Sequence, residues 1–207
     1  MIRTAYREDK WKFPFIAYTP KTTDKKLPLV IQLHGAGERG TGNDDLDKVD
    51  INGFAQFMDE EFEAIFVMPQ CPLNSFWAGK VESIIEFIEQ LKEEFPVDCD
   101  RVSLTGLSMG GYGTWFTAMA KPELFSAIAP VCGGGMAWNA GVLKMPVWAF
   151  HGVEDNVVSV TQSDEMVEGI KKNEGNVKYT RLDGVYHNVW INAYTKELID
   201  WLISHKR

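Results

Sequence analysis

The pentapeptide Gly106-Leu107-Ser108-Met109-Gly110 is the stretch that decides the fold of this 207-residue chain. It follows the apolar segment Arg101–Thr105, which is typical of a buried β-strand, and it leads into Met109–Ala120, which we expect to be helical. A Gly-x-Ser-x-Gly pattern between a strand and a helix indicates a sharp turn that exposes a nucleophilic serine. The glycines let the helix fold back against the strand without a Cβ clash. The pattern therefore predicts a strand-turn-helix unit with Ser108 at its apex.

Short apolar stretches alternate with longer helical patterns on both sides of this unit, which indicates parallel strands joined by crossover helices. We therefore expect an α/β fold with a mostly parallel, doubly wound sheet flanked by helices. A chain of this length suits a single domain over residues 1–207. The other expected strands are Phe13–Tyr18, Leu27–Leu33, Ala64–Met68, Ala127–Val131, Val147–Phe150 and Val177–Leu182; the other expected helices are Val81–Phe95, ended by Pro96, Val160–Lys172 and Trp190–Ile203.

The composition, with 45% hydrophobic and 24% charged residues, is that of an ordinary globular protein. A net charge of −8 repels phosphate backbones and anionic lipids, so we expect neither a nucleic-acid nor a membrane partner. The cysteines Cys71, Cys99 and Cys132 lack a CxxC spacing, so they suggest buried thiols and no metal site.

The first ten residues carry charges where a signal peptide would need an apolar stretch. The chain as written is therefore expected in the cytoplasm, and a chain from which a signal had been removed would be secreted. No pattern indicates an oligomeric state.

Serine needs a base within hydrogen-bond reach to act as a nucleophile, and histidine is the side chain suited to that exchange. Of the four histidines, His205 lies at the C-terminus, while His34 and His151 each end a strand just before a glycine, where a structural hydrogen bond is expected. His187 lies in the loop between the last expected strand and the last expected helix. We therefore predict that His187 is the base.

A buried carboxylate should orient that base, and in this type of fold it lies between the serine and the histidine along the chain. Asp155 satisfies this order, because it follows the strand Val147–Phe150 in a turn. Glu154 is its nearest competitor, and Asp183 lies too close to His187 along the chain to be a good partner. We predict Asp155 as the acid.

The tetrahedral intermediate of acyl transfer needs two hydrogen-bond donors at its oxygen. One is expected from the residue after the nucleophile, Met109, and the other from the glycine-rich turn that begins at His34. Within that turn Ala36 is the preferred donor and Gly37 the second choice. These two backbone N–H groups are the predicted oxyanion hole.

Three segments together resemble a family of small esterases: Leu33-His34-Gly35-Ala36-Gly37-Glu38-Arg39-Gly40, residues 106–115 around Ser108, and residues 151–158 around Asp155. The chain is similar to the small phospholipase/carboxylesterase-like and polyhydroxybutyrate-depolymerase-like esterases. The resemblance implies an α/β-hydrolase fold and ester hydrolysis without a cofactor. It also implies small-molecule or saccharide-linked substrates, since several relatives are feruloyl, acetyl-xylan or other plant-polysaccharide esterases.

These observations favour a serine carboxylesterase that hydrolyses short-chain or aryl and plant-polysaccharide-linked esters through an acyl-enzyme. A prolyl-oligopeptidase-like peptidase is an alternative, although the chain has no length for a gating domain. An acyltransferase with the same triad is another. A dienelactone-type hydrolase is expected to carry cysteine at the position of Ser108.

Other aromatic and charged residues are candidates for the surroundings of the site. Trp77 and Trp190 are candidates for a substrate-binding platform, with core or rim packing an equal alternative. Glu38 and Arg39 could fix the loop that carries Ala36. Only fourteen residues lie between Val131 and Pro146. We therefore expect no cap domain and an open site.

Overall fold

A computed structural model describes all residues, 1–207, and contains one eight-stranded sheet. The strand order is β1-β2-β4-β3-β5-β6-β7-β8; the pairs β1/β2 and β2/β4 are antiparallel and all others are parallel. The strands are β1 (Ile2–Tyr6), β2 (Phe15–Thr19), β3 (Leu27–Leu33), β4 (Ile65–Pro69), β5 (Val97–Leu107), β6 (Ala127–Val131), β7 (Val147–Gly152) and β8 (Val177–Leu182). This is the expected α/β-hydrolase architecture, and no cap domain is inserted.

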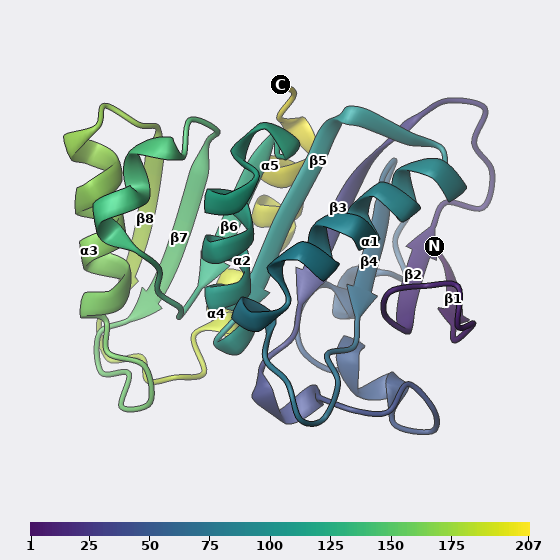
Figure 1. The fold of residues 1–207 in the computed structure, drawn as a ribbon, viewed down its shortest axis with the longest axis horizontal. Coiled ribbons are helices and arrows are strands. Elements are labelled where there is room, and N and C mark those ends of the chain that lie inside the picture. Colours follow the sequence, from purple (N-terminus) through teal and green to yellow (C-terminus); the bar gives the residue numbers. More distant parts are fainter.

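Helices cover both faces of the sheet (Figure 1), and they are α1 (Val81–Glu94), α2 (Met109–Ala120), α3 (Thr161–Lys172), α4 (Trp190–Ala193) and α5 (Lys196–Ser204). In Figure 1 the helices α1, α2 and α3 lie in front of the sheet, and α5 lies behind it. Six short 3-10 helices lie in the connections. None of the helices combines the length with the hydropathy that a membrane-spanning segment requires.

Two hydrophobic cores lie on opposite faces of the sheet, because successive side chains of a strand point to opposite sides. In β3, Leu29, Ile31 and Leu33 pack into the core shared with α1, α2 and α3. Val30, between them, packs into the core shared with α5. The central strands are buried on both faces, and the loops at their carboxyl ends remain available for a site.

Several boundaries differ from the sequence-based expectation. The edge strand β1 was not predicted, because its sequence Ile-Arg-Thr-Ala-Tyr is mostly exposed and lacks a continuous apolar run. Strand β5 begins at Val97, four residues before the expected start. The last expected helix is two helices, since Tyr194 leaves the helical conformation and Thr195 accepts a hydrogen bond from the Leu198 N–H as the N-cap of α5.

Candidate active site

Ser108 lies at the tip of the turn between β5 and α2 in a backbone conformation that L-residues rarely adopt, with φ 53° and ψ −113°. Its N–H donates to the Val131 carbonyl at 2.9 Å, which anchors the turn to the end of β6. The flanking glycines are required by close backbone approach. A Cβ on Gly110 would lie 2.0 Å from the Leu33 carbonyl oxygen, and one on Gly106 would lie 2.4 Å from the Gly110 oxygen.

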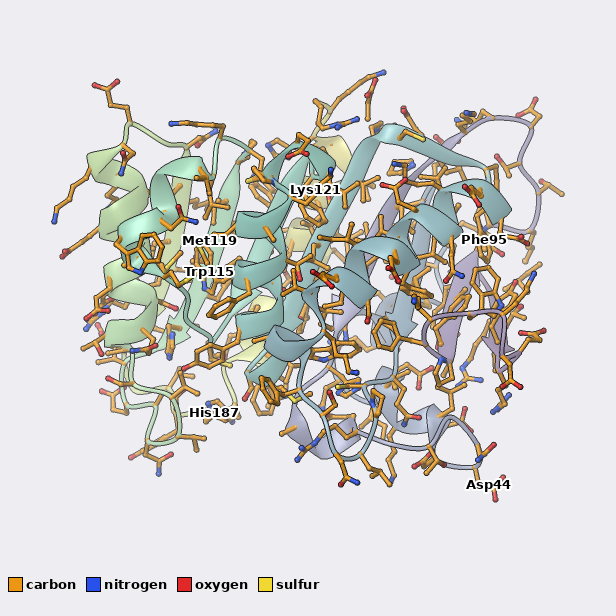
Figure 2. All side chains as sticks on the ribbon, in the orientation of Figure 1. Asp44, Phe95, Trp115, Met119, Lys121 and His187 are labelled. Atoms are coloured by element: carbon orange, nitrogen blue, oxygen red, sulfur yellow. The ribbon has the colours of Figure 1, made fainter.

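His187 and Asp155 come from neighbouring loops and complete a hydrogen-bonded chain with Ser108. The His187 Nε2 lies 2.8 Å from the Ser108 Oγ, and its Nδ1 lies 2.7 Å from the Asp155 Oδ2. An Nδ1–H that donates to the carboxylate leaves Nε2 free to accept the serine proton. Three loops at the carboxyl ends of β5, β7 and β8 thus meet at one point, and Figure 2 shows His187 at that edge of the sheet.

The Asp155 side chain is fully buried, and its other oxygen, Oδ1, accepts the N–H groups of Val157 and Val158 at 2.9 Å each. Burial alone would raise the pKa of this carboxyl group. The hydrogen bonds from His187, Val158 and Val157 outweigh burial and lower the pKa of Asp155 below its ordinary value. The carboxylate is therefore held ionised and fixed in orientation.

The loops of the acid and the base are also tied to each other through their backbones. The N–H of Val153 donates to the Leu182 carbonyl at 2.9 Å, and that of Glu154 donates to the Val185 carbonyl at 3.1 Å. A Cβ on Gly152 would lie 2.3 Å from the Val185 oxygen, so the two loops are in direct contact. The β7/β8 pairing therefore determines the spacing between Asp155 and His187.

None of the competing candidates forms a hydrogen bond with Ser108, although the His151 Nε2 lies 3.4 Å from the Asp155 Oδ2. Glu154 and Asp183 are exposed to solvent. The His151 ring is buried against the Ser163 hydroxyl and the Val158 carbonyl, at 2.7 and 3.0 Å. This is the structural role that its position at the end of a strand predicts.

The N–H groups of Met109 and Ala36 each begin a helix and form no hydrogen bond within the protein. Ala36 and Gly37 line the same cavity of about 370 Å³ as Ser108 and His187. The Arg39 guanidinium holds this turn, because its Nε donates to the Ala36 carbonyl at 2.9 Å and its Nη1 to the Ser75 carbonyl at 3.3 Å.

Trp77 does not form part of a substrate platform, contrary to one of the two sequence-based alternatives. Its side chain is fully buried, and its indole N–H donates to the His34 carbonyl at 3.0 Å. The His34 Nε2 in turn accepts the Cys71 N–H at 2.9 Å, and its Nδ1 lies 2.5 Å from the Gly35 carbonyl. Trp77 therefore supports the loop that carries Ala36 from within the core.

Trp190 lies at the site itself. Its ring meets the His187 imidazole edge-on, with 5.6 Å between centroids and an interplanar angle of 89°, and it lines the cavity that contains Ser108. Glu38 lines the same cavity and accepts a hydrogen bond from the Asn52 side chain at 2.9 Å. Its second oxygen is buried without a hydrogen-bond partner, 3.8 Å from the His34 Nδ1.

Phe76 is a site residue that the sequence did not single out. It lies in an extended conformation next to buried Trp77, so its ring points to the opposite side, where it is 59% exposed. It lines a second cavity beside Ser108 together with Ala78, Met109 and Tyr112. The signal available in the sequence was a second aromatic residue directly before Trp77 in the same loop.

One set of potential metal ligands lies here, since donor atoms of Cys132, Asp155 and His187 lie within 4.8 Å of one another. Burial raises the pKa of the Cys132 thiol to about 12, so it is a protonated thiol and a poor metal ligand. The carboxylate is engaged by His187 and two backbone N–H groups. These residues fit a proton-transfer chain better than a metal centre.

Comparisons with known proteins identify esterases among the relatives of this chain. The bifunctional acetylxylan esterase/xylanase of Neocallimastix patriciarum is 28% identical over 163 residues, covering 75% of this chain and 23% of that protein. Feruloyl esterase D of Neurospora crassa is 27% identical over 124 residues, covering 57% of this chain and 42% of that protein. The chain thus spans less than half the length of these two curated relatives.

The chain superposes on the crystal structure of a thermostable esterase with a TM-score of 0.85 and 33% identity. The superposition covers all of this chain and 63% of the esterase chain. The expected resemblance to feruloyl and acetyl-xylan esterases is confirmed. Residues 61–195, more than half of the chain, match the family model of the Dienelactone hydrolase family. Ser108, in the position where a dienelactone-type enzyme was expected to carry cysteine, had counted against that assignment. The family match overturns this argument, and the chain is a member of the Dienelactone hydrolase family.

Proposed function

We propose that the chain is a serine carboxylesterase in which Ser108 is the nucleophile, His187 the general base and Asp155 the acid that orients it. The observation that carries this proposal is the unbroken hydrogen-bonded chain from the Ser108 Oγ through both nitrogens of His187 to Asp155. The strained backbone of Ser108 supports it, because strain of this kind persists where a side chain must be held in place for chemistry.

The reaction follows from the geometry. The Ser108 Oγ attacks the ester carbonyl carbon while His187 Nε2 takes the hydroxyl proton, and the N–H groups of Met109 and Ala36 stabilise the developing oxyanion. His187 then donates the proton to the leaving alcohol, and an acyl-enzyme remains. The imidazole activates a water molecule that attacks the acyl-enzyme, and the carboxylic acid is released.

Water access favours hydrolysis over acyl transfer. The His187 side chain is 18% exposed, and no cap covers it, so water reaches the imidazole from solvent. An acyltransferase would have to exclude that water.

The substrates that we propose are short-chain esters and aryl or plant-polysaccharide-linked esters. The support is the similarity of the chain to an acetylxylan esterase/xylanase and to a feruloyl esterase. We also propose that residues 1–207 form a single catalytic domain, because all eight strands belong to one sheet.

The test is hydrolysis of p-nitrophenyl acetate by the wild-type chain and by Ser108→Ala. The variant is expected to lose activity by about 10³-fold or more, because the hydroxyl that forms the acyl-enzyme is absent. Circular dichroism checks that the fold is kept, and mass spectrometry after treatment with a phosphonate ester should locate the label on Ser108. Retention of more than a few per cent of the activity would refute the assignment.

A further inference from the structure

Two separate cavities meet at Ser108. The Phe76 cavity, of about 410 Å³, is lined by Phe76, Ala78, Ser108, Met109 and Tyr112. The Trp190 cavity, of about 370 Å³, is lined by residues 35–38, Leu107, Ser108, Val157, His187 and Trp190. An ester has two sides, the acyl group and the alcohol, so each cavity can receive one of them.

Proton transfer determines which cavity receives the alcohol. When the tetrahedral intermediate collapses, the alcohol oxygen must take its proton from the His187 Nε2, so that oxygen lies next to the imidazole. His187 lines the Trp190 cavity and does not line the Phe76 cavity. The acyl substituent on the same carbon points away from the alcohol oxygen, toward the remaining opening.

We propose that the Phe76 cavity is the acyl pocket, that the alcohol lies against Val157 and Trp190, and that Phe76 and Tyr112 select acyl groups larger than acetyl. This assignment rests on the esterase function proposed above. It identifies specificity-determining residues on each side of the scissile bond.

The size and lining of the Phe76 cavity indicate its ligand. Apart from Ser108, the residues that line this cavity are apolar or aromatic. Its volume is about 410 Å³, whereas the methyl group of an acetyl ester is comparable in volume to one water molecule, about 30 Å³. Phe76, which is 59% exposed, and Tyr112 both line this cavity, so their rings can contact a ligand there. The Tyr112 hydroxyl forms no hydrogen bond within the protein. A planar aromatic acyl group fits this cavity, because its ring can pack against the Phe76 and Tyr112 rings.

The wall of this pocket is held in place relative to the reacting atoms. The Phe76 loop is anchored by the buried indole of Trp77 and by the Arg39 guanidinium, which contacts both the Ser75 and the Ala36 carbonyls. The Gly79 N–H donates to the Phe76 carbonyl at 3.0 Å. The pocket and the turn that carries Ala36 therefore form one rigid unit.

The test uses two ester series and one filling variant for each cavity. In the acyl series, p-nitrophenol is kept and the acyl group changes from acetyl to 3-phenylpropanoyl. In the alcohol series, acetate is kept and the alcohol changes from methanol to 2-naphthol. Ala78→Leu fills the Phe76 cavity, and Val157→Phe fills the Trp190 cavity, where Val157 is 69% exposed and its N–H bond to Asp155 is retained.

Ala78→Leu is expected to lower the kcat/KM ratio of 3-phenylpropanoyl to acetyl ester by about tenfold and to change the ratio in the alcohol series by less than about twofold. Val157→Phe is expected to lower the kcat/KM ratio of the 2-naphthyl to the methyl ester by about tenfold and to change the ratio in the acyl series by less than about twofold. Phe76→Ala, which removes the wall without filling the cavity, should lower the acyl-series ratio through a higher KM. The control Trp138→Ala, at an 82% exposed position outside both cavities, should change neither ratio.

Two failures are distinguishable. If Ala78→Leu acts on the alcohol series and Val157→Phe on the acyl series, the assignment of the cavities is wrong while the esterase function stands. If the wild-type chain hydrolyses no ester, or Ser108→Ala is as active as the wild type, the proposed function itself is wrong and this assignment falls with it. Equal effects of both variants on both series also overturn the assignment.

Discussion

Acid lability of the loop that carries Ala36 is a consequence of the buried His34 ring. Burial lowers the pKa of His34 from 6.5 to about 4, and the neutral ring accepts the Cys71 N–H at Nε2. Protonation of Nε2 would remove this acceptor and place a charge in the core. The unfolded chain has no such restriction, so it binds the proton more readily than the folded chain does.

The sign and size of the effect follow from the two pKa values. Between pH 6.5 and about 4 the unfolded state holds more protons at His34 than the folded state, so the free energy of unfolding falls as the pH falls. The contribution is fully present above pH 6.5 and disappears toward pH 4. Between pH 7 and pH 5 the loss from this single residue amounts to about 2 kcal/mol.

The perturbation that isolates this contribution is His34→Gln, because glutamine offers an acceptor and does not titrate. Urea unfolding of both chains, followed by circular dichroism at several pH values between about 5 and 8, gives the free energy of unfolding. The variant is expected to be less stable than the wild type at pH 7 and to lose about 2 kcal/mol less on acidification. Groups remote from His34, including His151, titrate equally in both chains and cancel in the difference; Glu38, whose Oε2 lies 3.8 Å from the His34 Nδ1, is replaced by glutamine in both chains to remove its contribution. The same pH dependence in both chains would refute the reasoning.

Three further outcomes are expected. In steady-state kinetics, Asp155→Asn should lower kcat by several orders of magnitude with little change in KM, whereas Glu154→Gln, at an exposed position, should have almost no effect. The opposite result would identify Glu154 as the acid. Gly110→Ala should lower the melting temperature by several degrees and remove most activity, because the added Cβ would lie 2.0 Å from the Leu33 carbonyl oxygen. An unchanged melting temperature would contradict that contact. Without a cap, rates should not rise at the micelle threshold of long-chain esters, and a jump there would refute the open site.

The sequence predicted the elements that place the site, since these are strongly patterned. The segment around Ser108 combines a buried strand, a glycine-rich turn and a helix, and all three agree with one another. Asp155 and His187 were located by chain order and by their positions after strands, and the structure brings both to Ser108.

What the sequence did not reveal depends on contacts between distant segments. Trp77 and Trp190 are equally aromatic and equally close to loops along the chain, and only packing separates them: one ring is covered by the core, and the other stands beside His187. Phe76 was missed for the same reason. Strand β1 is held by pairing with β2, and its own residues have little apolar pattern.

The contact between the loops after β7 and β8 has a consequence for the order in which the chain becomes active during synthesis. The nucleophile and both proposed oxyanion donors lie within the first 109 residues, whereas His187 follows the last strand, β8, whose only paired strand is β7. Domains emerge from the ribosome N-terminal end first. The nascent chain therefore carries its serine long before it carries a base, and esterase turnover during translation or refolding should appear only when β8 docks.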